Sequence, residues 1–414
     1  MMLRRVSSRL LKFQLPDSRV AAFSPGTPDG SRGYAAHDEG YVDVPRPPKS
    51  KSERKPYVTP MKELIRRAKG EREARKLNPC RLLEDPPDNG LLVPELVDVA
   101  HRVHRYRESL LRDVSQLLRL VPVQRCRFCS EVHIGQAGHE IRTCTGPKSG
   151  LRSATHVWTN GDVEDVVSFP KCFHLFDRVG KPRVVHDERR SMPKVPAVVE
   201  LCIQAGLDLR KYPTRRRMKP VYSIEGRIVE FEDVADITES EMDLPSSDNN
   251  DLVDPHPLMT AARTIHTSSN SASGMVDWKQ LSMRTLETWT HMVDGVKKMM
   301  ESYKVWTCGY CPEVQVGPKG HKVRMCKASR HQSRNGLHAW QEATVEDIIG
   351  YNYVWHVENT DRPDLYNNLK RYYGKAPAVV ELCVRGGAPI PDKYRSMMRV
   401  DVVHPNRDEV DLIA

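Results

Sequence analysis

The sequence contains CRFCSEVHIGQAGHEIRTC, Cys126 to Cys144, and, 182 residues later, CGYCPEVQVGPKGHKVRMC, Cys308 to Cys326. Both copies have the form Cys-x2-Cys, eight residues, Gly-His, four residues and Cys. Self-similarity at a fixed distance is the signature of an internal repeat, and it decides the fold of the chain. We therefore read the chain as two copies of one unit.

Each copy offers three thiolates and an imidazole, which are the four ligands of a closed tetrahedral zinc site. We predict two zinc ions per chain. The Gly-His-x4-Cys half is similar to the end of a CCHC zinc knuckle, which favours the histidine inside each copy as the fourth ligand. The expected ligands are Cys126, Cys129, His139, Cys144, Cys308, Cys311, His321 and Cys326. His156 and His338 match at the same offset and are alternative fourth ligands.

The repeat extends beyond the cysteines in both directions. HVW and VEDVV of the first copy align with HAW and VEDII of the second, and PAVVELC occurs in both. Upstream, apolar residues recur at helical spacing in both copies, for example at Leu110 and Val114 and at Met292 and Val296. These patterns predict a mainly α fold with short strands in the metal cores, of class α+β.

This reading divides the chain into six parts. A run of ten acidic residues without lysine or arginine, from Glu230 to Asp254, predicts a disordered linker between two repeats. The expected parts are a transit peptide at 1–34, a basic, loosely ordered arm at 35–95, a first repeat at 96–219 with its zinc core at 126–144, an acidic and Ser-rich linker at 220–277, a second repeat at 278–399 with its zinc core at 308–326, and a tail at 400–414.

Positive charge gathers outside the acidic linker. The 414 residues carry a net charge of +10, which favours a polyanionic partner. Basic residues beside the metal cores suit RNA phosphates, and aromatic residues there suit unpaired bases. The candidate RNA-binding residues are Arg127, Phe128, Arg142, Arg215, Arg216, Arg217, Tyr310, Lys319, Lys322, Arg324 and Lys327.

The first 34 residues are rich in Arg and Ser, and apolar residues recur there at helical spacing. No acid precedes Asp17. This is the pattern of an organellar presequence, which we assign to the mitochondrion, with the chloroplast as the alternative. Disulfides are not expected in the matrix, so the ten cysteines indicate metal binding or burial.

Several classes of protein are disfavoured by the sequence. No apolar run reaches the length of a membrane-spanning helix, so membrane insertion is not expected. The G-x-S-x-G and P-loop motifs are absent, as is the H-x-E and P-C-x-x-C order of the zinc deaminases. We therefore expect no enzymatic activity.

The pattern CxxC, GHxxxxC, HxW, VED and PAVVELC, present twice, resembles the plant APO family, named for accumulation of photosystem one. The resemblance covers both repeats and implies an organellar protein with zinc-dependent RNA binding. It also implies a role in splicing of group II introns, with organellar RNA, intron-containing transcripts and other splicing factors as partners. An alternative interpretation of the family is assembly of complexes that contain 4Fe-4S clusters. A zinc-stabilised protein–protein adaptor is a further alternative.

Overall fold

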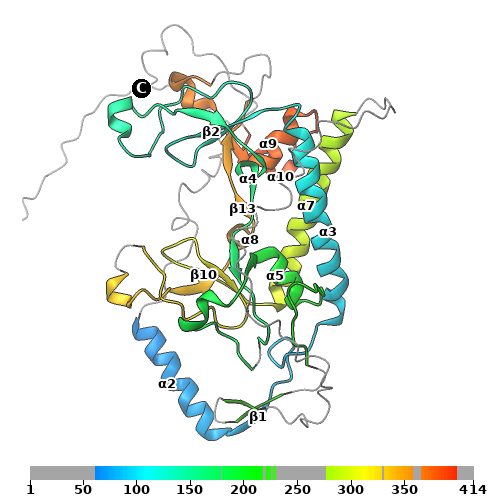
Figure 1. The fold of residues 1–414 in the computed structure, drawn as a ribbon, viewed down its shortest axis with the longest axis vertical. Coiled ribbons are helices and arrows are strands. Elements are labelled where there is room, and N and C mark those ends of the chain that lie inside the picture. The colour runs from blue at the N-terminus through cyan, green and yellow to red at the C-terminus, as the bar shows by residue number, and fades with distance from the viewer. Residues whose placement is uncertain are drawn as a thin grey trace, which may run out of the picture. The chain divides into compact units, whose positions relative to one another are not determined.

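Two long helices, one from each repeat, pack side by side (Figure 1). They are α3 (Pro94–Leu117) and α7 (Trp278–Ser302). The computed structural model describes residues 61–178, 180–217, 221–224, 227–229, 277–328, 331–357 and 365–398, which fall into one compact unit. The expected transit peptide, the acidic run and the C-terminal tail lie outside the described residues.

Local sequence explains where these helices begin and which face they bury. Pro94 lies in the first turn of α3, where a missing amide hydrogen costs nothing. The Asp277 side chain caps α7 by accepting a hydrogen bond from the Gln280 amide at 3.1 Å. The apolar stripes that the sequence predicts are buried, with Val114 and Met292 fully inaccessible. Each such side chain contributes about 1.5–3 kcal/mol through its burial.

The two repeats contain the same series of short elements, which one further short helix extends in the second repeat. In the first repeat they are β2 (Val123–Cys126), β3 (Val132–Ile134), η1 (Ser149–Arg152), β4 (Trp158–Asn160), α4 (Val163–Val166), β5 (Val167–Ser168), β6 (Lys171–Phe173), η2 (Asp187–Arg190), β7 (Lys194–Pro196) and α5 (Ala197–Gln204). In the second they are β10 (Val305–Cys308), β11 (Val314–Val316), η5 (Gln332–Arg334), β12 (Trp340–Glu342), α8 (Val345–Ile348), β13 (Gly350–Tyr351), β14 (Tyr353–Trp355), η6 (Asn367–Tyr372), β15 (Lys375–Pro377), α9 (Ala378–Arg385) and α10 (Asp392–Arg395).

Each repeat has two parts. A metal core contains a three-stranded antiparallel sheet, ordered β3-β2-β4 in the first repeat and β11-β10-β12 in the second. We call residues 123–160 the first metal core and 305–342 the second. A closing half follows, at 163–217 and at 345–398. The strands are thus not confined to the metal cores, because β6 pairs β7 and β14 pairs β15 within the closing halves.

The closing halves are exchanged between the repeats. Strand β3 of the first metal core packs against β14 and α9 of the second repeat, and β11 of the second core packs against β6 and α5 of the first. Each contact includes a backbone hydrogen bond. The Glu140 amide donates to the Leu365 carbonyl at 2.9 Å, and the Lys322 amide donates to the Val184 carbonyl at 2.8 Å. Between the two lies an antiparallel pair formed by β5 and β13.

This exchange corrects the interpretation of the repeats as two units that only a linker joins. Each metal core buries its apolar sheet face against residues that belong to the other repeat. One hydrophobic cluster accordingly contains residues of both repeats, from Leu96 to Met398. The repeats are one cooperative structure, because neither core has a complete set of buried neighbours from its own repeat alone.

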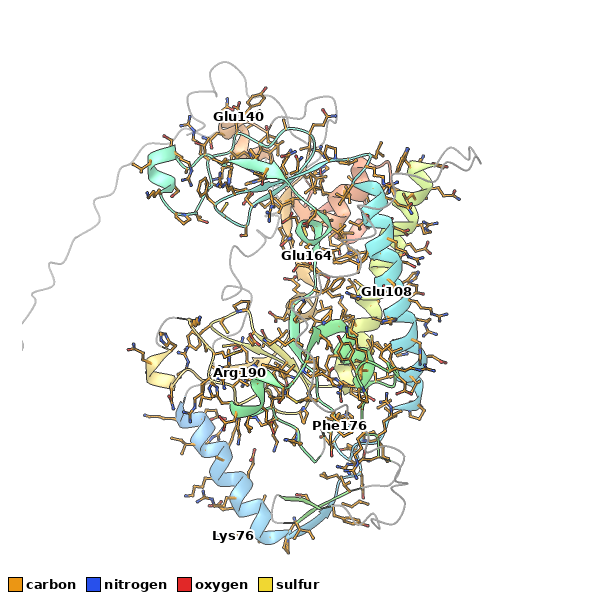
Figure 2. The ribbon with its side chains drawn as sticks, in the orientation of Figure 1. Lys76, Glu108, Glu140, Glu164, Phe176 and Arg190 are labelled. Atoms are coloured by element: carbon orange, nitrogen blue, oxygen red, sulfur yellow. The ribbon has the colours of Figure 1, made fainter. Side chains whose placement is uncertain are left out.

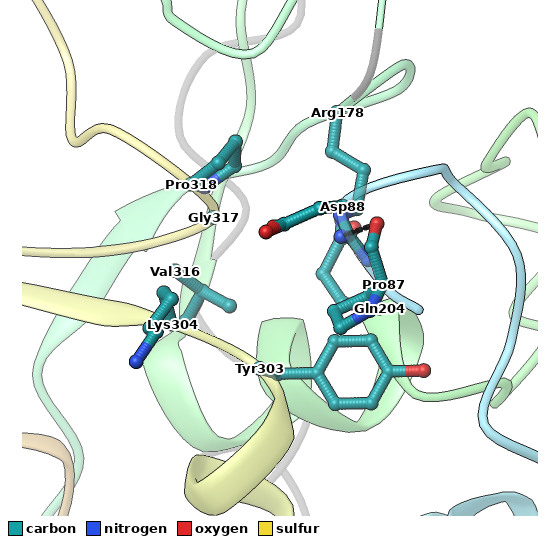
Figure 3. A pocket seen from close by; sticks show the side chains of 9 residues that line it. All are labelled: Pro87, Asp88, Arg178, Gln204, Tyr303, Lys304, Val316, Gly317 and Pro318. Carbon is teal, nitrogen blue, oxygen red and sulfur yellow. Dashed lines mark hydrogen bonds between the residues drawn. The ribbon is translucent and has the colours of Figure 1, made fainter. Parts of the chain in front are cut away.

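Part of the expected basic arm and linker is also ordered. The arm forms α2 (Met61–Leu77) and β1 (Cys80–Leu82), and β1 pairs with β8 (Tyr222–Ile224), which continues into β9 (Arg227–Val229). The segment after β1 brings Pro87 against both repeats, where Arg178, Tyr303 and Val316 line a cavity of about 10 Å³ (Figure 3). A cavity of this size has room for about one water molecule and for no larger ligand.

Candidate metal centres

The first metal core brings Cys126, Cys129, Cys144 and His156 together, with their ligand atoms within 4.8 Å of one another. Cys126 is the last residue of β2 and pairs with Trp158, the first residue of β4. This pairing brings His156, two residues before Trp158, close to Cys126. Nδ1 of His156 lies 3.4 Å from Sγ of Cys129. Nε2 of the same ring lies 3.0 Å from Thr143 Oγ1, a contact that would leave Nδ1 free to bind a metal.

The second metal core repeats this arrangement. Cys308, Cys311, Cys326 and His338 have ligand atoms within 4.8 Å of one another. Nδ1 of His338 lies 3.2 Å from Sγ of Cys311, and β10 pairs with β12 as β2 pairs with β4. Two Cys3His groups that could hold a metal ion are therefore present in the described part of the chain.

The structure corrects the expected fourth ligand in both cores. His139 and His321 lie outside the ligand groups, with ring centroids 5.0 and 4.8 Å from those of His156 and His338. His321 accepts the Val323 amide at its Nδ1, 3.1 Å away, and turns Nε2 toward a carboxylate. The alternative ligands His156 and His338 hold the fourth positions.

His139 and His321 instead belong to contacts that join the two repeats. Nε2 of His139 lies 3.6 Å from Glu131, and Lys375 of the second repeat reaches the same carboxylate at 3.4 Å. Burial alone would raise the pKa of Glu131, but His139 and Lys375 lower it to about 2. Glu313 has the same arrangement, with His321 at 3.5 Å and Lys194 of the first repeat at 3.0 Å.

The surroundings of the sulfur and nitrogen atoms suit a bound cation. The backbone amides of Phe128 and Tyr310 donate to Cys126 Sγ at 3.4 Å and to Cys308 Sγ at 3.5 Å. Hydrogen bonds from Cys311, His338 and the Tyr310 amide lower the pKa of Cys308, while the contact with Cys308 raises the pKa of Cys311, so Cys308 is the thiol of this pair that loses its proton first. Burial and the neighbouring His139 lower the pKa of His156 to about 4, so the ring is neutral at pH 7, as a ligand must be.

Trp158 and Trp340 serve the packing of the cores. Their indole nitrogens donate to the backbone oxygens of His139 and His321, at 3.2 and 2.9 Å. The indoles cover the preceding glycines so closely that a Cβ at Gly138 would lie 2.1 Å from the Trp158 ring. This contact explains the Gly-His pair of the motif, because any side chain before the histidine would displace the tryptophan.

The candidate RNA-binding residues beside the metal cores lie on the surface. Phe128 is 38% exposed and Tyr310 is 46% exposed. The basic candidates around them are also exposed, namely Arg127, Arg142, Lys319, Lys322, Arg324 and Lys327. Figure 2 shows the side chains that surround both cores.

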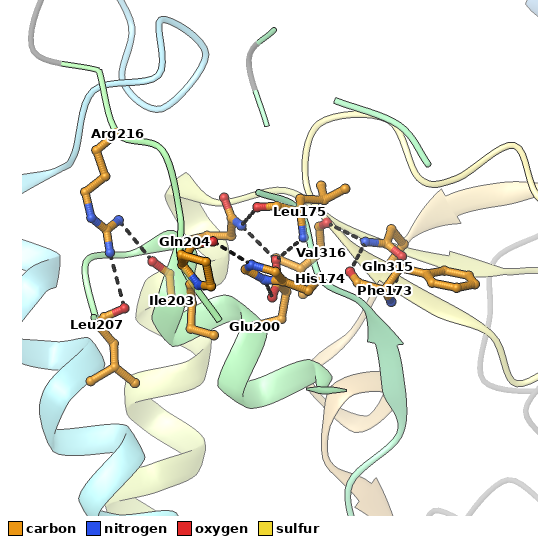
Figure 4. A network of polar contacts seen from close by, with 11 residues as sticks. Phe173, His174, Leu175, Glu200, Ile203, Gln204, Leu207, Arg216, Gln315 and Val316 are labelled. Atoms are coloured by element: carbon orange, nitrogen blue, oxygen red, sulfur yellow. Dashed lines mark hydrogen bonds and ion pairs between the residues drawn. The ribbon is translucent and has the colours of Figure 1, made fainter. Parts of the chain in front are cut away.

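Two of the three consecutive arginines at 215–217 are engaged by contacts within the fold, which corrects their assignment as phosphate contacts. Arg216 donates to the Ile203 and Leu207 carbonyls at the end of α5, at 3.1 and 3.2 Å (Figure 4). Arg217 has a side chain only 1% exposed and pairs with Asp177 at 3.2 Å. Both stabilise the closing half of the first repeat, and Arg215 alone remains exposed.

Each core also contains a stacked arginine that the residue pattern did not lead us to predict. Arg152 covers the Phe128 ring, with its guanidinium carbon 4.0 Å from the ring centroid, and Arg334 covers Tyr310 at 4.1 Å. The two arginines are 182 residues apart, so the repeat itself contained the signal.

Comparison with known proteins places this arrangement in a family. A family model described as APO RNA-binding matches residues 31–230 and 266–407, and the chain belongs to this family. The chain is 64% identical to APO protein 3, mitochondrial, of Arabidopsis thaliana, over 91% of this chain and 90% of that protein. It is 42% identical to APO protein 2, chloroplastic, of the same plant, over 86% of this chain and 78% of that protein.

These comparisons also bear on location and on structure. The chain is more similar to the mitochondrial relative than to the chloroplastic ones. This similarity assigns the chain to the mitochondrion, as the presequence predicts. No solved structure matches the chain. Within the described residues, every helix is too short or too polar to cross a bilayer.

Proposed function

We propose that this chain binds mitochondrial RNA through two zinc-loaded cores and supports splicing of intron-containing transcripts. The observation that carries the proposal is a surface that occurs twice, in which an exposed aromatic residue and exposed basic residues adjoin a Cys3His group, in a member of the APO RNA-binding family. The splicing role is supported by the family resemblance alone.

Zinc is the metal that suits this donor set. Three thiolates and one imidazole at mutual distances within 4.8 Å fit tetrahedral zinc. An iron–sulfur cluster is more commonly held by four thiolates. With four protein ligands a zinc site has no open position for a substrate, so the proposed role of the metal is structural. We propose no catalytic activity for the chain.

The electrostatic part of the proposal is tested by a matched pair of variants. Lys322→Gln with Arg324→Gln removes two exposed charges beside the second core, and Lys297→Gln with Lys298→Gln removes two exposed charges from α7. For single-stranded RNA, the first pair should reduce the slope of log affinity against log salt by about 1.4, because each neutralised phosphate contributes about 0.7. The second pair should leave the slope unchanged. Equal slopes in all three proteins would contradict the proposal.

The biological part is tested in mitochondria that lack the protein. We expect unspliced intron-containing transcripts to accumulate, and crosslinking of the protein in isolated mitochondria should recover those RNAs. Normal splicing together with loss of iron–sulfur enzymes would favour the cluster-assembly alternative. Normal splicing with no RNA affinity at low salt would favour a protein–protein adaptor.

A further inference from the structure

Each metal core has a stacked pair of an aromatic ring and a guanidinium at its surface. The pairs are Phe128 with Arg152 and Tyr310 with Arg334. The aromatic residue lies two positions after the first cysteine ligand, and its amide donates to that sulfur. The backbone that carries each ring is therefore tied to the metal core.

The edge of each guanidinium is held in place. Arg152 donates from Nη1 to the Pro147 carbonyl at 2.9 Å, and its Nη2 lies 3.5 Å from Cys144 Sγ. Arg334 has the matching contact, with Nη2 3.5 Å from Cys326 Sγ. Because these contacts lie at the edge of a planar group, they fix the plane and leave its faces for stacking.

A purely structural role does not account for the exposure of these rings. Phe128 and Tyr310 remain 38% and 46% exposed although each is covered on one side by an arginine. The same exposed pair occurs in both repeats, although the residue before the aromatic ring is arginine in one and glycine in the other. Exposed basic residues also occur in both cores, where Arg127 precedes Phe128 and Lys327 follows the ligand Cys326.

We infer that each stacked pair binds one unpaired nucleobase, which stacks on an outer face of the pair. This inference rests on the proposed function of RNA binding and specifies the form of RNA. A base in single-stranded RNA has a free face that can stack on an aromatic or guanidinium plane. In a duplex both faces are covered by neighbouring base pairs. The chain should therefore prefer RNA with unpaired nucleotides.

The test uses the full, zinc-loaded chain and two probes: an unstructured oligonucleotide that contains one 2-aminopurine, and the same strand annealed to its complement. Phe128→Leu and Tyr310→Leu keep the apolar bulk, so zinc content and melting temperature should stay unchanged. Each variant should weaken single-strand binding at least about fivefold, the lower end for loss of one stacked base. Duplex binding should be unchanged. Phe176→Leu, at an exposed phenylalanine outside the pairs (Figure 2), is the control.

A second measurement needs no variant. Single-stranded RNA with 4-thiouridine, crosslinked to the unmodified chain, should leave adducts on peptides that contain Phe128 or Tyr310, and 2-aminopurine fluorescence should be quenched on binding. Two results would overturn this inference and leave RNA binding intact. In the first, the unmodified chain binds the single strand and both leucine variants bind it equally well. In the second, the leucine variants lose affinity equally for the single strand and the duplex. Absence of RNA binding by the unmodified chain would overturn the proposed function as well.

Discussion

Gln315 holds the second metal core to the closing half of the first repeat. It is 1% exposed, its Nε2 donates to the Phe173 carbonyl at 2.7 Å, and its Oε1 accepts the Phe173 amide at 3.2 Å (Figure 4). Gln315→Ala leaves two buried backbone groups without these partners. Each unpaired group costs about 1–3 kcal/mol, so we expect the free energy of unfolding to fall by about 2–6 kcal/mol. This is a large part of the usual stability of a domain.

The assay is urea unfolding at a fixed zinc concentration, followed by circular dichroism and tryptophan fluorescence. The two signals should change together, because the exchanged repeats form one cooperative unit. His133→Ala is the matched control, since His133 occupies the equivalent buried position and neither ring nitrogen has a hydrogen-bond partner within the described residues. That variant should cost at least about 1 kcal/mol less. Equal losses in the two variants would refute the argument that Gln315 joins the repeats.

Three further predictions follow from the same contacts. Elemental analysis of Cys129→Ser should show the loss of one of two zinc ions. The remaining core should also bind zinc more weakly, because each core packs on the other repeat. An unchanged zinc affinity at the remaining core would show that the two cores are uncoupled. Arg217→Ala should cost about 3–5 kcal/mol in urea unfolding because it breaks a buried ion pair, while exposed Arg215→Ala should cost less than about 1 kcal/mol. Burial alone would lower the pKa of His174, but Glu200 raises it, so the pair stabilises the fold fully below about pH 6.5 and less as the pH rises through the folded pKa. Urea unfolding at pH 6 and pH 9 should show this loss, and His174→Gln should remove it.

The sequence predicts those parts of the fold that depend on local pattern. The long helices α3 and α7 follow from apolar spacing. The short helices α4 and α8 begin at capping boxes, at Asp162 and Thr344. The cysteine ligands follow from their spacing. Burial of Cys202 and Cys383 follows from the apolar helices that contain them, and both are fully buried.

The exchange could not be predicted from the repeat. Two similar units offer similar complementary faces, so a metal core can pack on the closing half of its own repeat or on that of the other repeat. The fourth ligand was misassigned for a related reason. Both histidines of each copy match at the same offset, so the repeat does not distinguish them. Glu131 and Glu313, which also match, are the residues that pair with His139 and His321, and they were not considered as partners.

The exchange has a consequence for the order in which the protein matures. The first metal core hydrogen-bonds to Leu365 and Asn367, which lie more than two hundred residues later in the chain. During synthesis, or during import from the N-terminus, this core stays without its cover until nearly the whole polypeptide has emerged. Val132 and Ile134 are buried in the complete structure, and they would lack the cover of β14 and α9 throughout that interval. The first half of the chain therefore needs protection from aggregation until the second repeat has folded onto it. A chain truncated before Leu365 would leave this sheet of the first metal core exposed permanently.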